Sequence, residues 1–227
     1  MAPVALIMAG GTGGHIFPGL ALAQGLIERG WRVHWLGAGA PSMESQLVPA
    51  RGIDLQTVDF GGLRGKGWRT ALGLPRRLWR ALQQSRQILR QLQPQVVVGF
   101  GGYISFPGGC MARWLGIPLI LHEQNSVAGM ANRWLARLAQ RVYCAFPQAL
   151  PQGVWVGNPL RAEFLRQAPP EQRFAARGHR EPAVAQGVGA ETKTRACHGL
   201  VLPSPSGVAA ATALVIGKRF KGGDQQT

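Results

Sequence analysis

Apolar and polar positions follow two repeating patterns along the chain. Short runs rich in Val, Ile and Leu, such as Val4–Ala9, are almost entirely apolar, which is typical of strands buried on both faces of a sheet. Between these runs lie longer stretches, such as Pro75–Leu92, in which apolar residues recur three and four positions apart. That spacing is typical of helices with one face in the core. The alternation predicts an α/β fold.

The predicted strands share short length and apolar character, and they are Val4–Ala9, Arg32–Leu36, Asp54–Phe60, Gln95–Phe100, Pro118–His122, Arg141–Ala145 and, as a candidate seventh, Val154–Val156. The predicted helices are bounded by Pro, Gly or polar residues, and they are Pro18–Arg29, Met43–Ala50, Pro75–Leu92, Pro107–Leu115 and Gly129–Ala139. Together they predict a Rossmann-like parallel sheet with helices on both faces.

The regular alternation stops at about Arg177. Residues 178–227 mix Gly, Ala, Thr, Ser and Pro with scattered charge and have no sustained period. We therefore interpret residues 1–161 as one Rossmann-like domain and residues 162–177 as the start of an inter-domain segment. Residues 178–227 are interpreted as an irregular tail that is not a native domain.

Positive charge dominates the chain, with 25 Lys and Arg against 10 Asp and Glu and a formal net charge of +15. The excess is local, because no acidic residue occurs between Asp59 and Glu123. Such a patch suits nucleic acid, an anionic membrane or a phosphorylated substrate. The chain lacks an RNA-stacking aromatic motif and a recognisable DNA-reading helix, so we expect no nucleic-acid partner.

The chain has three cysteines, Cys110, Cys144 and Cys197, far apart and in no CxxC pair. This spacing argues against a disulfide framework and against a zinc site, and it fits a reducing compartment. No Asp-x-Asp pair or other cluster of metal ligands is evident. The sequence therefore predicts no metal site and no cofactor.

Two glycine-rich loops follow predicted strands. The first, Gly10–His15, carries Thr12, Gly13 and Gly14 before a helix, and the second includes Gly101, Gly102 and Tyr103. Glycines let backbone N–H groups approach a ligand closely, and a helix N-terminus favours an anion. The first loop fits neither the dinucleotide fingerprint nor the P-loop. We expect the two loops to hold a diphosphate, and the alternative is a pair of tight turns without a ligand.

Four polar residues, His122-Glu123-Gln124-Asn125, end the fifth predicted strand. Burying such side chains is costly unless they form hydrogen bonds or serve a function. In the alternative interpretation Asn125 caps the next helix and the others are solvated. A later turn, Val-Gly-Asn-Pro-Leu-Arg, ends at Arg161 and is weak evidence on its own.

Taken together, these segments resemble the MurG family of glycosyltransferases. The matching segments, in family order, are Gly-Gly-Thr-Gly-Gly-His-Ile-Phe-Pro-Gly, Gly-Phe-Gly-Gly-Tyr-Ile-Ser-Phe-Pro-Gly-Gly, His-Glu-Gln-Asn-Ser-Val-Ala-Gly-Met-Ala-Asn-Arg and Val-Gly-Asn-Pro-Leu-Arg. The resemblance covers about residues 1–175. It implies the N-terminal, acceptor-binding half of a GT-B glycosyltransferase, in which two Rossmann-like domains face each other across a cleft.

The resemblance implies transfer of N-acetylglucosamine from UDP-N-acetylglucosamine to the muramoyl 4-hydroxyl of lipid I, with inversion and a β-1,4 link. His15 is the implied general base, a role that suits an imidazole titrating near neutrality. Glu123 and Tyr103 are expected to orient the acceptor, while Gly101 and Gly102 belong to the loops that hold its diphosphate. The residues implied to contact the donor are Thr12, Gly13, Gly14, Asn125 and Arg161.

In this family a second domain with a Gly-Gly-Ser loop is expected after Arg161, and no such loop follows here. A frameshift or truncated reading frame would produce this loss of pattern. We therefore expect a second domain that is largely missing, and no measurable UDP-sugar binding by this chain alone. The alternative to an enzyme is a non-catalytic fragment that binds lipid I or the membrane surface.

The region 67–90 is predicted to dock on the cytoplasmic face of the bacterial inner membrane as a peripheral protein. On a helix starting near Pro75, one face is apolar and forms a core stripe of Leu78, Leu82, Leu89 and Leu92. The opposite face is basic and carries Arg76, Arg80, Arg86 and Arg90, with Trp79 among them. Trp68 and Leu72 lie just upstream. Trp and basic residues suit an anionic lipid interface. The alternative is a solvated basic helix with Trp79 packed under a loop.

Overall fold

The computed structural model describes residues 2–61 and 73–159. Their strands form one seven-stranded sheet in the order β3-β2-β1-β4-β5-β6-β7, and every pair of neighbours is parallel. The strands are β1 (Val4–Ala9), β2 (Arg32–Gly37), β3 (Asp54–Thr57), β4 (Val96–Gly101), β5 (Leu119–Glu123), β6 (Arg141–Cys144) and β7 (Val154–Trp155). The parallel sheet predicted from the apolar runs is confirmed.

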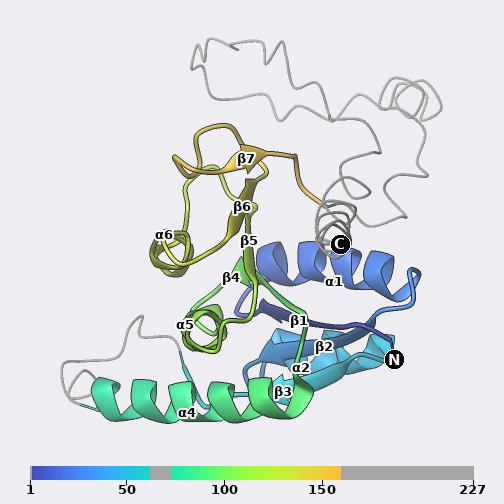
Figure 1. The fold of residues 1–227 in the computed structure, drawn as a ribbon, viewed down its shortest axis with the longest axis vertical. Helices are drawn as coiled ribbons and strands as arrows, with labels where there is room; N and C mark the ends of the chain where they lie inside the picture. Colours follow the sequence, from blue (N-terminus) through green and yellow to red (C-terminus); the bar gives the residue numbers. More distant parts are fainter. Residues whose placement is uncertain (1, 62–72, 160–227) are drawn as a thin grey trace, which may run out of the picture.

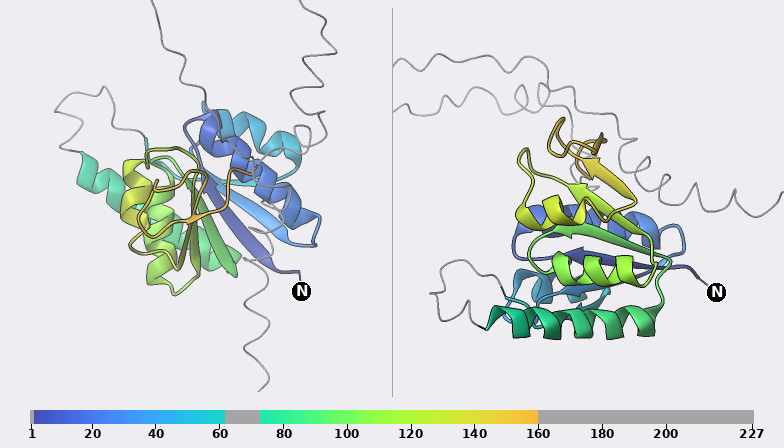
Figure 2. Two further views of the ribbon diagram at one scale, coloured as in Figure 1. Left: turned by 90° about the horizontal axis from the view of Figure 1, so that it is seen from above. Right: turned by 60° about the vertical axis from the view of Figure 1, so that its left-hand side comes forward.

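Helices cover both faces of this sheet (Figure 1). They are α1 (Gly13–Ile27), α2 (Met43–Leu47) with the 3-10 turn η1 (Pro49–Arg51), α4 (Leu74–Leu92), α5 (Ser105–Trp114) and α6 (Met130–Leu135). Figure 2 shows the sheet between α1 on one side and α4 and α5 on the other. Each predicted helix is present, with boundaries that differ by up to five residues.

The core consists of two layers because side chains alternate between the faces of each strand. On one face, Ile7 and Trp35 pack against Leu20 and Leu26 of α1. On the other, Leu6, Met8 and Leu121 pack against α4, α5 and α6. Because both faces are covered, β1, β4 and β5 are buried along their whole lengths.

The chain reverses its direction of travel across the sheet at β1. Strands β2 and β3 extend the sheet on one side of β1, while β4 and its successors extend it on the other. In open α/β sheets ligands bind beyond the carboxyl ends of the strands at such a switch point. The loops that follow β1 and β4 therefore lie where a ligand site is expected.

Candidate functional site

Both predicted glycine loops meet at the switch point. Strands β1 and β4 pair directly, and the register shifts between Met8 and Ala9, so that Ala9 pairs with Gly101. The shift is a local irregularity of the kind found beside functional sites. Gly101 and Gly102 have φ of 102° and 83°, a region that favours glycine. A Cβ on Gly102 would overlap the backbone of Gly10, so the two loops touch.

The first loop leads into α1 earlier than the sequence predicted. The helix begins at Gly13 and not near Pro18, which lies inside it. His15 N and Ile16 N donate to the carbonyl oxygen of Thr12 at 3.1 and 3.2 Å. Thr12 makes no side-chain cap, and the first turn has no acidic residue. The predicted residues Thr12 to His15 thus form the positive N-terminus of a helix.

His15 is half-buried and contacts the residue that follows β5. Its Nδ1 lies within hydrogen-bonding distance of Nε2 of Gln124. Burial lowers the pKa of His15, while the charge of Glu123 and the backbone carbonyl of Phe100 act in the opposite direction. The net lowering favours a neutral imidazole at neutral pH, which is the form that can accept a proton.

Glu123, which was predicted with Tyr103 to orient the acceptor, is fully buried. Its Oε1 accepts from N and Nδ2 of Asn125, both at 2.9 Å. Its Oε2 accepts from Gly129 N at 3.2 Å and from Asn132 Nδ2 at 2.9 Å. These bonds fold the loop between β5 and α6 around one carboxylate. Asn125 therefore does not cap the helix, because Gly129 is the N-cap of α6.

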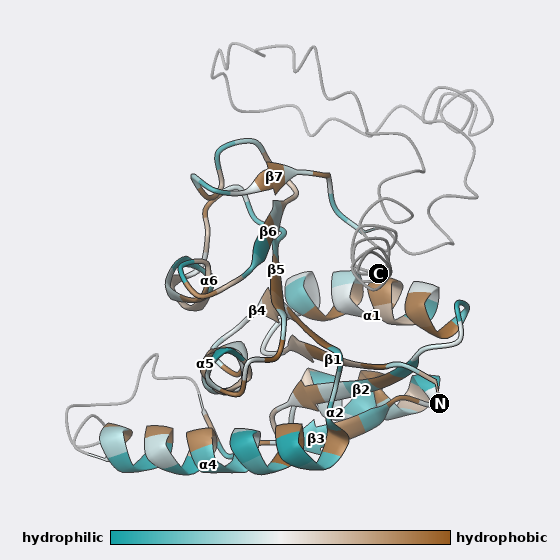
Figure 3. Ribbon diagram, viewed as in Figure 1, coloured by the Kyte–Doolittle hydropathy of each residue, from teal (hydrophilic) through white to brown (hydrophobic). Residues whose placement is uncertain are grey.

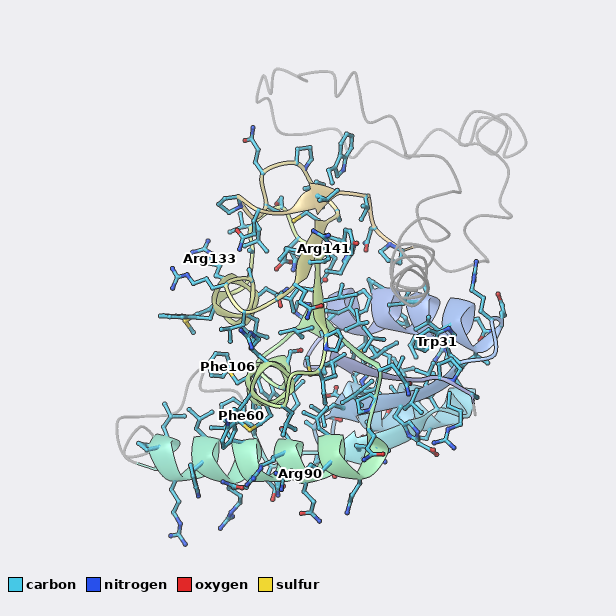
Figure 4. All side chains as sticks on the ribbon, viewed as in Figure 1. Trp31, Phe60, Arg90, Phe106, Arg133 and Arg141 are labelled. Carbon is cyan, nitrogen blue, oxygen red and sulfur yellow. The ribbon has the colours of Figure 1, made fainter. Side chains whose placement is uncertain are left out.

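An apolar cavity of about 430 Å³ opens beside these loops. His15, Gly101, Gly102, Tyr103 and Glu123 all line it, so the structure brings five of the predicted site residues together. The rest of the lining is largely apolar and includes Phe60, Leu74, Leu78, Phe106, Met130 and Trp134. Figure 4 shows Phe60 between α4 and α5, and Phe106 at α5, the helix to which it belongs.

Tyr103 stands at the junction of the cavity and the glycine loops. Its ring lies 6.3 Å from that of Phe60, centroid to centroid. Burial, and then the nearby charge of Glu44, raise the pKa of its hydroxyl. The side chain therefore stays protonated at neutral pH and can donate a hydrogen bond into the cavity.

Three buried polar residues of this region were missed as individual site residues. Gln124 contacts His15, and Asn132 binds Glu123. Glu44 is fully buried and accepts from Gly11 N at 3.4 Å and Ala38 N at 3.1 Å. Glu44 thereby joins the first glycine loop to the end of β2. Gln124 lies in the polar run that ends β5, and Asn132 lies in the same family-like segment, whereas Glu44 had no sequence signal.

Asn125 is exposed. Arg161 lies outside the described residues, as do the segments 162–177 and 178–227. The predicted donor contacts of Thr12, Gly13, Gly14 and Asn125 remain predictions, as do the roles of His15, Glu123 and Tyr103.

On α4, Arg76, Trp79 and Arg80 are all exposed, and Trp79 keeps 64% of its surface accessible. The alternative in which Trp79 packs under a loop is therefore wrong for the described residues. Figure 3 shows hydrophilic residues along α4 at the outside of the molecule. Trp68 and Leu72 lie outside the described residues.

Arg86 corrects the predicted helical wheel. It is half-buried, and its guanidinium lies 5.3 Å from the centroid of the Trp114 ring. The core face of α4 is centred on Ala81, Ser85, Ile88 and Leu89, which turns Arg86 toward α5. Stacking on an indole ring stabilises a guanidinium that is partly removed from water.

In the described part of the chain, no three His, Cys, Asp or Glu side chains gather as a metal site would require. Over the same residues, none of the helices has both the length and the apolar character needed to cross a bilayer.

Comparison with known proteins bears on the same region. Residues 5–144 match the model of the glycosyltransferase family 28 N-terminal domain. An N-acetylglucosamine transferase of Albidiferax ferrireducens is 64% identical over 177 residues, 76% of this chain and 46% of that protein. One from Acidovorax sp. (strain JS42) is 62% identical over 173 residues, 76% of this chain and 43% of that protein. Both bear the name "UDP-N-acetylglucosamine--N-acetylmuramyl-(pentapeptide) pyrophosphoryl-undecaprenol N-acetylglucosamine transferase".

Among solved structures, MurG of Acinetobacter baumannii matches with a TM-score of 0.60 and 37% identity, over 69% of this chain and 45% of that one. A UDP-N-acetylglucosamine 2-epimerase matches with a TM-score of 0.51 at 14% identity, over 66% of this chain and 43% of that one, and shares the fold alone. The chain spans about half the length of the curated relatives it matches.

Proposed function

The chain belongs to glycosyltransferase family 28 through its N-terminal domain, and from that premise we propose that it supplies the acceptor-binding half of an N-acetylglucosaminyltransferase of peptidoglycan synthesis. The donor is UDP-N-acetylglucosamine, and the acceptor is lipid I, the undecaprenyl-diphosphate-linked muramoyl pentapeptide. Both substrates are those in the printed name of relatives that are 62% and 64% identical. Transfer forms a β-1,4 link with inversion.

The observation that carries the proposal is the meeting of both glycine loops with His15 at the edge of one cavity. A sugar hydroxyl that attacks a donor must lose its proton, and a neutral imidazole within reach can take it. Burial keeps the pKa of His15 below its usual value. His15 is accordingly the general base for the muramoyl 4-hydroxyl.

The backbone groups of the site are arranged to bind a negatively charged ligand. The N-terminus of α1 carries the positive end of the helix dipole, and its first turn contains no acidic side chain. The second loop adds two positive-φ glycines beside it. This supports binding of the acceptor diphosphate at the junction of the loops, with Thr12, Gly13, Gly14 and Asn125 available to the donor.

The apolar part of the cavity reaches the first turns of α4. Leu74 and Leu78 line the cavity from the first turns of α4, while Arg76, Trp79 and Arg80 are exposed on the same turns. A lipid-linked acceptor is presented at a membrane surface, and this arrangement places basic and aromatic side chains beside the cavity. We therefore assign α4 as the docking element for the anionic cytoplasmic face of the inner membrane, where the protein is peripheral.

A chimera tests the proposal. Residues 1–161 are joined to the C-terminal half of the Albidiferax relative, and the product is incubated with labelled UDP-N-acetylglucosamine and a short-chain lipid I analogue. The expected result is a disaccharide product with a β-1,4 link. A chimera that binds the lipid I analogue without transfer supports the non-catalytic alternative, and a folded chimera that neither binds nor transfers contradicts both.

A further inference from the structure

Three motifs of the sequence are joined by one buried row of polar groups. Nε2 of His122 lies 3.0 Å from the carbonyl oxygen of Gly157. Gln124 stands two residues further along the same strand direction, on the same face, and contacts Nδ1 of His15. The side chain of Gln124 also lies beside the imidazole of His122 and interacts with it. The row thus runs from α1 through β5 to the turn after β7.

Donor and acceptor rules limit how protons are arranged in this row. A carbonyl oxygen only accepts, so Nε2 of His122 must donate to Gly157. His122 is buried, which favours the neutral ring, and its Nδ1 is then a lone-pair acceptor. An amide N–H of Gln124 is the donor that this lone pair requires.

With its nitrogen toward His15, the Gln124 amide does not meet this requirement. It points Nε2 of Gln124 at His15 and leaves Oε1 of Gln124 and Nδ1 of His122 buried without a hydrogen-bond partner. Amide oxygen and nitrogen are assigned from the hydrogen-bond network, and turning the amide by 180° exchanges them. After the turn, the amide nitrogen faces His122 and the amide oxygen faces Nδ1 of His15.

We propose, resting on the function proposed above, that Gln124 is a positioning residue that holds His15 in its Nδ1–H tautomer and thereby leaves Nε2 as the proton-accepting nitrogen. His122 orients Gln124, and the Gly157 carbonyl orients His122. The row therefore couples the geometry of the base to the turn that follows the last described strand. A buried polar network of this kind specifies one arrangement because every member must be satisfied.

The competing acceptor is the carbonyl of Phe100 on β4, which also acts on the His15 imidazole. If this carbonyl accepts a hydrogen bond from an Nε2–H of His15, His15 has the opposite tautomer, and Oε1 of Gln124 and Nδ1 of His122 remain unpaired. Glu123 on β5 is the charged group that acts on both imidazoles. Its charge raises the pKa of each ring but does not choose between the nitrogens.

Nitrogen-15 NMR of the 227-residue chain distinguishes the two tautomers, because protonated and unprotonated ring nitrogens have widely separated shifts. His15 is assigned from the signals lost in His15→Gln. At neutral pH we expect the Nδ1–H pattern for His15 and the Nε2–H pattern for His122. An Nε2–H pattern for His15 in the unaltered chain overturns the proposal without any variant.

Substitutions at position 124 give the second test. Gln124→Met keeps the size but removes the acceptor, so the His15 signals should move to a mixture of tautomers. Gln124→Glu restores an acceptor, so the Nδ1–H pattern should return with a raised His15 pKa. The control is Gln24→Met, an exposed change on α1, the helix that carries His15. It should alter neither the tautomer nor the pKa of His15. Unchanged His15 signals in a folded Gln124→Met chain contradict the proposal.

The positioning role of Gln124 and the proposed function can be rejected independently of each other. An inactive chimera with His15 in the Nδ1–H form rejects the proposed function but leaves the positioning role intact. An active chimera in which Gln124→Met changes neither the tautomer nor the pH profile of kcat/KM rejects the positioning role alone. If the proposed function and the positioning role are both correct, Gln124→Met should shift the pH profile of kcat/KM, and Gln124→Glu should recover most of kcat.

Discussion

Gly102 faces Gly10 so closely that a Cβ on Gly102 would overlap the carbonyl oxygen of Gly10. Gly102 also has a φ of 83°, which is unfavourable for residues with a Cβ. We expect Gly102→Ala to lower the free energy of unfolding by on the order of 3 kcal/mol, as the sum of backbone strain and steric overlap. Urea denaturation measures the loss.

The matched control for this change is Gly30→Ala. Gly30 has a φ of 80°, but nothing lies within 4 Å of its added Cβ. Gly30→Ala should therefore lower the free energy of unfolding by the backbone strain alone, about 1 to 2 kcal/mol. Equal losses for the two variants would show that the glycine loops are not in contact.

Glu123→Gln should destabilise the protein by about 2 to 3 kcal/mol, because one carboxylate oxygen that accepts from buried N–H groups becomes an amide nitrogen facing the same donors. Glu28→Gln, on the exposed end of α1, should cost less than about 0.5 kcal/mol. A similarly small cost at position 123 would contradict the role of Glu123 in folding the loop before α6.

Stability should fall as the solution is acidified through the histidine range. Burial lowers the pKa of His15, His34 and His122 below 6.5, the value expected for the unfolded chain. The contribution of these neutral histidines to the free energy of unfolding is therefore complete above about pH 6.5. It is lost as the pH falls through their folded-state pKa values. Thermal melting at pH 7.5, 6.5 and 5.5 measures this decline, and His122→Gln should make it shallower. A melting temperature that rises on acidification would refute the assignment.

Membrane docking through α4 is tested by co-sedimentation with vesicles. Binding should require anionic lipid, weaken with salt, and drop several-fold in the double variant Trp79→Ser and Arg80→Gln, since each basic residue near the surface contributes about 1 kcal/mol. The double variant Trp155→Ser and Arg141→Gln alters an exposed Trp and Arg on β7 and β6 and should bind normally. Binding to neutral vesicles at the same level would exclude this docking mode.

The apolar runs and the helical spacing of apolar residues were sufficient to predict the strands and helices, because each buried strand is a continuous apolar run. The start of α1 was misplaced by five residues, since Gly13 and Gly14 have poor helix propensity and were interpreted as loop. Tertiary contacts around the first loop outweigh that propensity. Arg86 was misplaced for a related reason, because its stacking partner Trp114 lies on another helix.

The partners within the site could not be predicted in the same way. His15 and Gln124 meet only because α1 begins at the end of a strand that neighbours β4, which in turn neighbours β5. Glu44 has no distinguishing local pattern, and Asn132 lies in a family-like segment that does not show what it binds. The roles of both depend on which loops the sheet order brings beside them. Motif resemblance identified the loops, but the buried polar contacts that hold them are a property of the folded chain.

The most direct test of the account is the turnover of the chimera with His15→Ala. If His15 is the general base, kcat should fall by roughly 10²- to 10⁴-fold, with little change in the KM for the lipid I analogue. His34→Ala, at a histidine on β2 outside the cavity lining, should retain turnover once its folding is verified. A His15→Ala chimera with near-normal kcat would contradict the assignment of this loop as the catalytic site.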